Sequence, residues 1–347
     1  MEGTGKVSAS EFYTEYHGHK VNHLSKVLPS LRASCDSLIW TAGDSSLDNK
    51  YWFRDTAEAV GAYQHALEPP ISKCDVTYWL NYLSFSMTKA ESSHTISKEK
   101  LAAINTAVEA TTLNQRSRKL LPQDVFLREN IKSNDVLIVS IGGNDVALFP
   151  TPCTILSMAG ALCLPTVCVE NTCTCYALPC NDYCCGCGPS LFSCPGTFPP
   201  CLGYFRHLFG VRIQNYIEKL TLKTKPKKIL VCMIYYLDEK NTMSWAGPAL
   251  SAMGYNSNPK KLQLLIKKIF EQATSNIKIN GSEVIPIPFF DVLDGKITDD
   301  YIARVEPSVS GGRKLAEFLL FHATGDSNYV YKNSATGTVS NTMYRAL

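Results

Sequence analysis

Two glycine-containing segments carry side chains suited to nucleophilic chemistry. Residues 43–46 (GDSS) follow the apolar run 37–41, and residues 142–145 (GGND) follow the apolar run 135–141. A serine on a tight turn can act as a nucleophile, and an asparagine amide beside it can donate hydrogen bonds to an oxyanion. Each segment taken alone has a composition that is also common in turns without any catalytic role. The two together, each after a strand-like run, indicate a catalytic site with a serine nucleophile and an oxyanion donor.

The order of the predicted elements would bring these two segments together. We predict strands over residues 37–41, 76–83, 135–141, 229–236 and 284–290, and helices over residues 97–110, 204–222, 258–273 and 314–321. Strands that alternate with helices predict a mostly parallel sheet covered on both faces. Ligands bind beyond the carboxyl ends of the strands in such a sheet. Residues 306–311, which follow the last strand, belong to the same edge.

Between about residues 36 and 322 the sequence resembles the SGNH (GDSL) hydrolases. The segment 43–47 is similar to the first block of that family, and Gly142-x-Asn144-Asp145 is similar to the third. The resemblance implies a flavodoxin-like three-layer α/β/α sandwich with a parallel five-stranded sheet of order 2-1-3-4-5, and hydrolysis of an ester or related acyl bond. It also implies that Ser45 is the nucleophile, and that its own N–H and the Asn144 side chain donate to the oxyanion. The supporting positions of these blocks are Gly43, Asp44, Gly142 and Asp145.

The second block of the family contains a glycine whose backbone N–H completes the oxyanion hole. Residues 81–88 (NYLSFSMT) align with this block and place Ser86 at the glycine position. We therefore expect the Ser86 N–H to be the third donor, provided that the serine adopts a backbone conformation that glycine tolerates more easily.

The last block departs further from the family pattern, which is Asp-x-x-His. Glu306 stands at the histidine position, Ala303 stands at the aspartate position, and Asp299 and Asp300 lie just upstream. A free carboxylate is a weaker base than imidazole by about two pK units, or about 3 kcal/mol. Burial beside the nucleophile would recover part of this difference. The histidines that could supply a base from elsewhere in the chain are His65, His94, His207 and His322. His94 follows the second block and His207 follows the expected insertion, so these two are the alternatives to test.

The cysteines are concentrated in one segment. Eleven of the 14 lie between Cys153 and Cys201, in an expected insertion over residues 150–203. The spacing lacks the two separated C-x2-C pairs of a typical zinc site. Adjacent cysteines with irregular gaps fit a disulfide-stapled loop, whereas the lack of a secretory signal argues against an oxidising compartment. The apolar stretch 154–169 could pack on the domain or enter a membrane interface with acylated cysteines. Disulfides, a metal site and membrane contact are all left open.

Composition and charge exclude several classes of protein. The chain has 347 residues, of which 45% are hydrophobic, and a formal net charge of +3. This composition excludes a disordered or collagen-like chain, and the small charge gives no reason to expect nucleic acid as a partner. No apolar run reaches the roughly 18 residues of a spanning helix, and the first residues lack the pattern of a secretory signal. We expect a cytoplasmic protein with neither metal nor cofactor.

Three regions are expected along the chain. A solvated polar extension would cover residues 1–34, the hydrolase-like domain residues 35–322, and a polar tail residues 323–347. The histidines of the extension are His17, His19 and His23.

Three hypotheses about function follow. The first is a serine hydrolase that acts on a small-molecule ester or acylated substrate through Ser45, with Glu306 or a relocated base. The second is a pseudoenzyme of the same fold that binds an acyl or glycan ligand without cleaving it. The third is a protein that makes peripheral membrane contact through residues 153–201.

Overall fold

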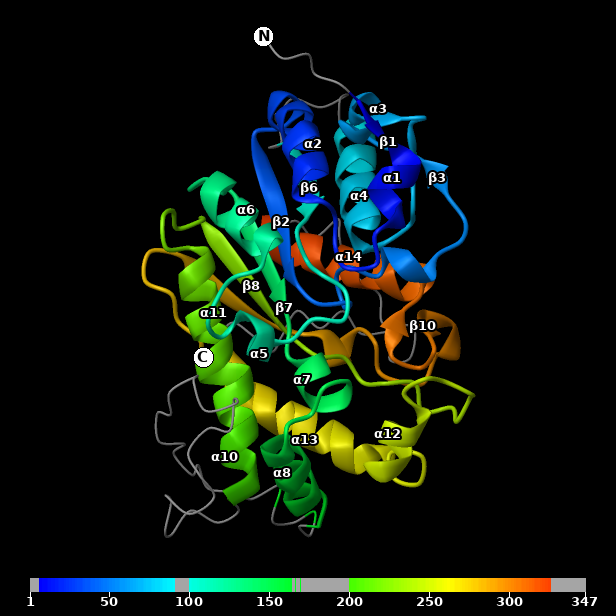
Figure 1. Cartoon of the computed structure of the whole chain (residues 1–347), viewed down its shortest axis with the longest axis vertical. Helices are drawn as coiled ribbons and strands as arrows, with labels where there is room; N and C mark the ends of the chain where they lie inside the picture. The colour runs from blue at the N-terminus through cyan, green and yellow to red at the C-terminus, as the bar shows by residue number, and fades with distance from the viewer. Residues whose placement is uncertain (1–5, 91–99, 164–165, 167–168, 170–199, 326–347) are drawn as a thin grey trace.

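Five parallel strands form the central sheet of the protein (Figure 1). The computed structural model describes residues 6–90, 100–163, 166, 169 and 200–325. The strands are β2 (Ser37–Gly43), β6 (Leu101–Asn105), β7 (Val136–Ser140), β8 (Lys228–Met233) and β9 (Glu283–Pro288). They lie side by side in the order β6-β2-β7-β8-β9, and each neighbouring pair is parallel. Numbered along the chain this is the order 2-1-3-4-5, so the predicted topology is confirmed.

The strands are apolar on both faces, and helices cover each face. Leu38, Trp40 and Ala42 of β2 belong to one buried cluster, whereas Ile39 belongs to the other, because successive side chains of a strand point to opposite faces. The first cluster is covered by α2 (Val21–Ser34), α6 (Pro122–Asn130), α11 (Ile213–Leu220) and α13 (Pro259–Gln272). The second is covered by α4 (Val76–Ala90) and α14 (Val309–Thr324). The chain therefore forms the expected three-layer α/β/α sandwich.

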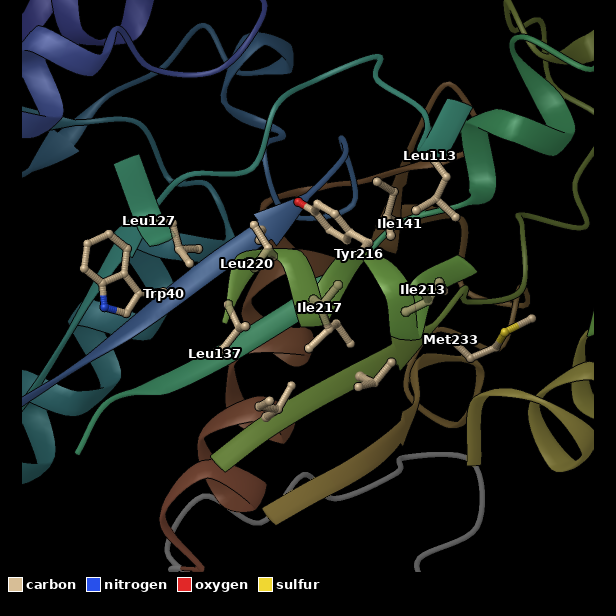
Figure 2. Packing of buried hydrophobic residues seen from close by; sticks show 14 of the residues in the cluster. Trp40, Leu113, Leu127, Leu137, Ile141, Ile213, Tyr216, Ile217, Leu220 and Met233 are labelled. Carbon is tan, nitrogen blue, oxygen red and sulfur yellow. The ribbon is translucent and has the colours of Figure 1, made fainter. Parts of the chain in front are cut away.

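Helix α11 shows how the amphipathic pattern of the sequence builds one of these layers. Figure 2 shows Ile213, Ile217 and Leu220 of α11 packed on the sheet, where Leu137 of β7 belongs to the same cluster. Their spacing places them on one face of a helix, and each is almost fully buried. Burial of a side chain of this size stabilises the fold by about 1.5–3 kcal/mol.

Two of the predicted elements are wrong in type. Residues 76–83, predicted as a strand, belong to helix α4, and residues 101–105, predicted within a helix, form strand β6. The aromatic and β-branched residues of the first segment favour a strand locally, but its buried residues follow helical spacing in the structure. The second segment is a short apolar run that pairs along its whole length with β2. The second strand of the sheet is therefore β6.

The remaining elements lie around this framework. The other helices are α1 (Ala9–Thr14), α3 (Tyr63–Ala66), α5 (Leu113–Arg116), α7 (Gly143–Ala147), α8 (Pro152–Cys163), α10 (Pro200–Arg206) and α12 (Gly247–Ala252), with a π-helical segment, η2 (His207–Arg212), between α10 and α11. Short 3-10 turns are η1 (Lys50–Trp52), η3 (Thr274–Asn276), η4 (Phe289–Asp291) and η5 (Thr298–Asp300). Three small two-stranded sheets pair β1 (Val7–Ser8) with β4 (Leu67–Glu68), β3 (Ala57–Glu58) with β5 (Ile71–Ser72), and β10 (Tyr301–Ile302) with β11 (Glu306–Pro307).

The expectation of a solvated N-terminal extension is wrong for the described part of residues 1–34. Phe12 of α1 and Leu24 of α2 lie in the main buried cluster, and His19 is buried with its ring stacked on Phe12. The Gly18 N–H donates to the Asp48 carboxylate over 3.0 Å, close to the serine turn. This segment is part of the domain.

Most of the cysteine-rich window lies outside the described residues. The pairs Cys173-x-Cys175 and Cys185-x-Cys187 are among those not described. Four cysteines of the described part are free thiols: Cys35, Cys74, Cys163 and Cys232. Within that part, no group of three or more His, Cys, Asp or Glu side chains could hold a metal ion. Its helices also include none that is both long and apolar enough to cross a membrane.

Candidate active site

Ser45 lies in the turn that follows β2, at the carboxyl edge of the sheet. The turn requires Gly43, whose φ is +132° and whose position leaves no room for a side chain: a Cβ would lie 1.7 Å from the Ser140 carbonyl oxygen. This close approach allows the Asp44 N–H to donate to the same carbonyl over 3.0 Å. Strands β2 and β7 therefore stay paired up to the serine, which is buried.

Asn144 lies in the first turn of α7, directly after β7. The chain enters this helix through Gly142, whose φ of +112° is a conformation that favours glycine. The Asn144 amide donates one hydrogen to the Thr111 carbonyl over 3.0 Å, so the side chain is held while its second hydrogen can serve a ligand. The Asp145 carboxylate accepts hydrogen bonds from two backbone N–H groups of α5. Both side chains of this block thus join α7 to the neighbouring loop.

Glu306 is brought to Ser45 by the hairpin of β10 and β11. The hairpin pairs Ile302 with Glu306, and the Pro307 carbonyl accepts a hydrogen bond from the Asn49 side chain over 2.9 Å. The Ser45 hydroxyl donates to Glu306 Oε1 over 3.3 Å. The structure thus brings together the serine and the carboxylate that the sequence singled out.

Burial controls the protonation of Glu306. It raises the pKa of this carboxyl to about 8; the Ser45 hydrogen bond opposes the rise, and the charges of Asp44 and Asp48 add to it. The second oxygen, Oε2, has no hydrogen-bond partner among the described residues. Burial also raises the pKa of Asp44, to about 6. The raised pKa makes the ionised form of Glu306 a stronger base than an exposed carboxylate.

A second buried carboxyl, Glu109, belongs to the same site and was not predicted from the sequence. It follows β6, and its Oε1 accepts a hydrogen bond from the Trp52 indole over 3.0 Å. Its Oε2, like that of Glu306, has no partner within the described part of the chain. Burial raises the pKa of Glu109 to about 9, and the charge of Glu306 is the next cause. Because the two carboxyls influence each other, their protons belong to the pair.

The expectation that Ser86 contributes to this site is wrong. Ser86 is exposed on α4. The start of that helix lies near the site, because the Val76 N–H donates over 3.2 Å to the Asn49 side chain, which also contacts Pro307. Ser86 comes ten residues later, and a helix rises about 1.5 Å per residue, so the serine lies about 15 Å along the helix from that end. The error follows from the assignment of residues 76–83 to a strand.

The loop after β6 lies beside Asn144. Its Thr111 carbonyl accepts the Asn144 hydrogen bond, and the preceding residue, Ala110, has a φ of +55°. A left-handed conformation costs a residue with a side chain about 1–2 kcal/mol, and such strain is concentrated at functional sites. Ala110 therefore replaces Ser86 as the candidate for the third backbone donor.

The structure adds no support for either histidine considered as the alternative base. His94 lies outside the described residues, and His207 is buried within η2. The backbone carbonyl of His322 accepts from Lys228 at the start of β8, so His322 lies at the opposite edge of the sheet. The structure instead places His17 next to Glu109, where its Nδ1 lies 3.0 Å from the Glu109 carbonyl oxygen. His17 lies before the first strand of the sheet and outside every segment that resembles a family block, so no sequence motif marks it.

The turn between β10 and β11 contains Ala303, which stands at the aspartate position of the last block. Ala303 and Arg304 both have left-handed backbones, with φ values of +48° and +68°. The Arg304 guanidinium is buried and donates to the Asp238 carbonyl over 3.0 and 3.3 Å, and to two asparagine side chains. These bonds hold the strained turn and so fix the strand that carries Glu306. The two carboxylate oxygens of Asp300 accept hydrogen bonds from Ser310 and Lys314.

We expect Glu109→Gln to flatten the dependence of stability on pH. Because the folded pKa of Glu109 is raised, the folded state keeps a proton that the unfolded state loses above about pH 4.3. The free energy of unfolding contributed by this group therefore falls as pH rises from about 4.5 towards 9. Chemical unfolding of wild type and variant across this range measures the difference. The exposed Glu58→Gln is the control, and an unchanged wild-type slope in Glu109→Gln would contradict the carboxyl pair.

Comparison with known proteins gives distant structural similarity only. No protein-family model matches the sequence, and no curated protein is significantly similar to it. An extracellular lipase from Streptomyces rimosus is 11% identical, with a TM-score of 0.41 over 83% of this chain and 100% of the lipase. A variant of an acetyl xylan esterase from Geobacillus stearothermophilus is 13% identical, with a TM-score of 0.40 over 84% and 96%. A carbohydrate esterase family 3 protein from Talaromyces cellulolyticus is 10% identical, with a TM-score of 0.33 over 82% and 94%.

These similarities are too low to support an argument about activity. The fold rests on the structure itself, namely the parallel sheet of order 2-1-3-4-5 with helices on both faces. At the carboxyl edge of that sheet lie Ser45 of the first sequence block and Asn144 of the third. By this topology the chain has a flavodoxin-like three-layer α/β/α fold, and it places the two segments that resemble blocks of the SGNH (GDSL) hydrolases at the edge of the sheet where such folds bind ligands.

Proposed function

We propose that the protein hydrolyses a small ester or a related acyl bond, with Ser45 as the nucleophile and Glu306 as its base. The hydrogen bond from the Ser45 hydroxyl to Glu306 Oε1 supports this proposal most directly. A general base must lie within hydrogen-bond reach of the proton that it removes. The raised pKa of Glu306 gives its ionised form the basicity that an exposed glutamate lacks.

The reaction would run through an acyl-enzyme. Glu306 Oε1 takes the Ser45 proton as Oγ attacks the carbonyl carbon, and the same carboxyl then gives this proton to the departing alcohol. A water molecule, deprotonated by Glu306, attacks the acyl carbon and releases the acid, and the proton returns to Ser45. The negative charge of each tetrahedral intermediate would be met by the Ser45 N–H, the free Asn144 amide hydrogen and the Ala110 N–H.

A groove beside the hairpin offers a place for the apolar part of the substrate. It has a volume of about 590 Å³ and is lined in part by Phe53, Trp79, Ile302 and Val309. Ile302 is the register partner of Glu306, and directly paired residues carry their side chains on the same face of a hairpin. We therefore propose that an acyl or aromatic group of the substrate enters this groove. No cofactor takes part in the proposed reaction.

Labelling with a fluorophosphonate probe tests the proposed nucleophile. We expect wild-type protein to be labelled and Ser45→Ala to lose the label completely. Ser46→Ala is the matched control, because Ser46 is buried to the same 7% exposure but contacts Asp44 and Ser140. It should keep the label.

Two outcomes would contradict the proposal. Labelling that survives in Ser45→Ala would assign the nucleophile to another residue. An unlabelled wild-type protein that melts at a higher temperature with an acyl or glycan ligand would identify a binding protein of the same fold.

A further inference from the structure

Two buried carboxyl oxygens close to the serine turn have no hydrogen-bond partner among the residues that the structure describes. They are Oε2 of Glu109 and Oε2 of Glu306, and these two residues are only 1% and 4% exposed. A buried oxygen that lacks a hydrogen bond destabilises a fold, so each such atom in a native protein needs an explanation. Two of them at one site point to a common explanation.

The turn that follows β2 holds both glutamates. The Asp48 carboxylate accepts a hydrogen bond from the Glu109 N–H over 2.9 Å. The next residue, Asn49, donates through its side chain to the Pro307 carbonyl over 2.9 Å, one position after Glu306. Consecutive residues of one turn therefore fix the two backbone segments that carry the carboxyls.

Tyr16 and Tyr235 lie close enough to both carboxyls to sense their charges. Burial raises the pKa of Tyr16, and the charges of Glu109 and Glu306 are the next causes. Burial is also the largest cause of the raised pKa of Tyr235, to which the charges of both glutamates contribute. A further titratable neighbour, His17, contacts the backbone carbonyl of Glu109, 3.0 Å from its Nδ1. Two tyrosines from distant parts of the chain thus place both carboxyls in one part of the site.

The other oxygen of each carboxyl is already bound. The Trp52 indole donates to Glu109 Oε1 over 3.0 Å, and the Ser45 hydroxyl donates to Glu306 Oε1 over 3.3 Å. Each side chain therefore has one oxygen left. Two carboxylates repel each other, whereas a carboxylic acid donates a strong, short hydrogen bond to a carboxylate. One proton between the two remaining oxygens would satisfy both.

The charges around the pair favour such a shared proton. Burial raises the pKa of Glu109 to about 9, and the charge of Glu306 is the next cause, so ionisation of Glu306 favours a proton on Glu109. The Asp48 charge adds to this rise, and the Lys50 charge opposes it. The Lys50 ammonium donates to Asp48 over 2.7 Å, so its charge is balanced there. For Glu306, burial is the largest cause of the raised pKa, and the Asp44 charge adds to it.

We propose that Glu109 is the positioning residue of the base: its protonated carboxyl donates a hydrogen bond to Oε2 of Glu306 and so holds Oε1 towards Ser45. The inference rests on the proposed function of Ser45 and Glu306. It gives Glu109 the task that the aspartate of a catalytic triad performs for its histidine, which is to orient the base. The proton of Glu109 stays on Glu109, and only the proton of Glu306 moves to and from Ser45 and the departing alcohol.

Steady-state kinetics of two Glu109 variants test this role. Glu109→Gln keeps the length of the side chain and an amide donor for Glu306, so it should keep most of the wild-type kcat. Glu109→Met has a similar length but no donor. Its kcat should fall by about 10²-fold, the effect of a misplaced catalytic group, with KM unchanged. The exposed Glu58→Met is the control and should behave as wild type.

The pH profile separates this role from a merely structural one. A hydrogen bond to the ionised form of a carboxyl lowers its pKa. The pH midpoint of kcat/KM should therefore rise by about one unit in Glu109→Met and stay near the wild-type value in Glu109→Gln. Loss of packing alone would lower stability without moving the midpoint.

Two kinetic outcomes would overturn the positioning role. The first is a Glu109→Met protein with the wild-type kcat and midpoint while Ser45→Ala and Glu306→Gln are inactive, which leaves the proposed function intact. The second is a Glu109→Gln protein as inactive as Glu109→Met at an unchanged melting temperature. Turnover that survives in Ser45→Ala would instead contradict the proposed function, and the positioning role with it.

Carbon-13 NMR of protein labelled at the glutamate carboxyl carbons measures the pair without turnover, and it does not need Glu109→Met to fold. Glu109→Gln identifies the Glu109 resonance by its loss. Because Glu306→Gln removes the neighbouring charge, it should lower the pKa of Glu109 by about one unit or more. An unchanged pKa of Glu109 in that variant would overturn the shared proton.

Discussion

Glu306→Gln should lower kcat/KM for a small ester by about 10²- to 10⁴-fold, the usual contribution of a general base, without loss of stability. Glutamine keeps the size of the side chain and can still accept the Ser45 hydrogen bond, but it cannot take up a proton. Because burial disfavours the charged form of Glu306, its removal should leave the free energy of unfolding at pH 8 unchanged or higher. Ester hydrolysis and chemical unfolding of the same preparations measure both effects.

The pH profile of the wild type provides a second test of this base. In the proposed mechanism the ionised carboxylate is the active form, so kcat/KM should rise with pH and level off above the folded pKa of about 8. Ser45→Ala supplies the background of uncatalysed hydrolysis, and the exposed Glu58→Gln should behave as wild type. A Glu306→Gln protein that keeps its activity would assign the base to another group, and His17 beside Glu109 would be tested next.

Gly43→Ala should abolish the native fold or reduce the free energy of unfolding by more than about 4 kcal/mol, a loss that few single substitutions cause. The added Cβ would lie 1.7 Å from the Ser140 carbonyl oxygen, and the backbone φ of +132° disfavours any side chain. The chain could relieve this clash only by separating β2 from β7, next to the serine turn. Equilibrium unfolding monitored by circular dichroism measures the loss.

Gly254→Ala is the matched control for this effect. Gly254 also has a positive φ, +68°, but nothing lies within 4 Å of the position of its Cβ. We expect that variant to lose about 1–2 kcal/mol from backbone strain alone. Similar losses at the two positions would show that the close approach of β2 and β7 contributes little.

The sequence predicted the sheet well where local and tertiary preferences agree. The runs that became β2, β7, β8 and β9 are apolar, short and bounded by turn residues, so the same pattern favours a strand before and after packing. Residues 76–83 are different, because their aromatic residues favour a strand while their packing on β6 and α14 requires a helix. Tertiary context overrides propensity in such segments.

The candidate site was predictable only where a motif marks it. Ser45, Asn144 and Glu306 were found because each stands in a block of recognisable spacing, and the structure places all three residues at one edge of the sheet. Glu109 has no such block. Its importance depends on burial and on its proximity to Glu306, and neither property can be inferred until β6 is correctly assigned.

The separation of Ser45 from Glu306 has a consequence for protein synthesis. The two residues are 261 positions apart, so the first four strands of the sheet emerge from the ribosome before the carboxylate exists. Until the hairpin of β10 and β11 has been made and docked, a nascent chain has the serine turn without the Glu306 carboxylate. The proposed nucleophile would therefore become reactive only after this late docking, and it would be protected from esters that it meets during translation.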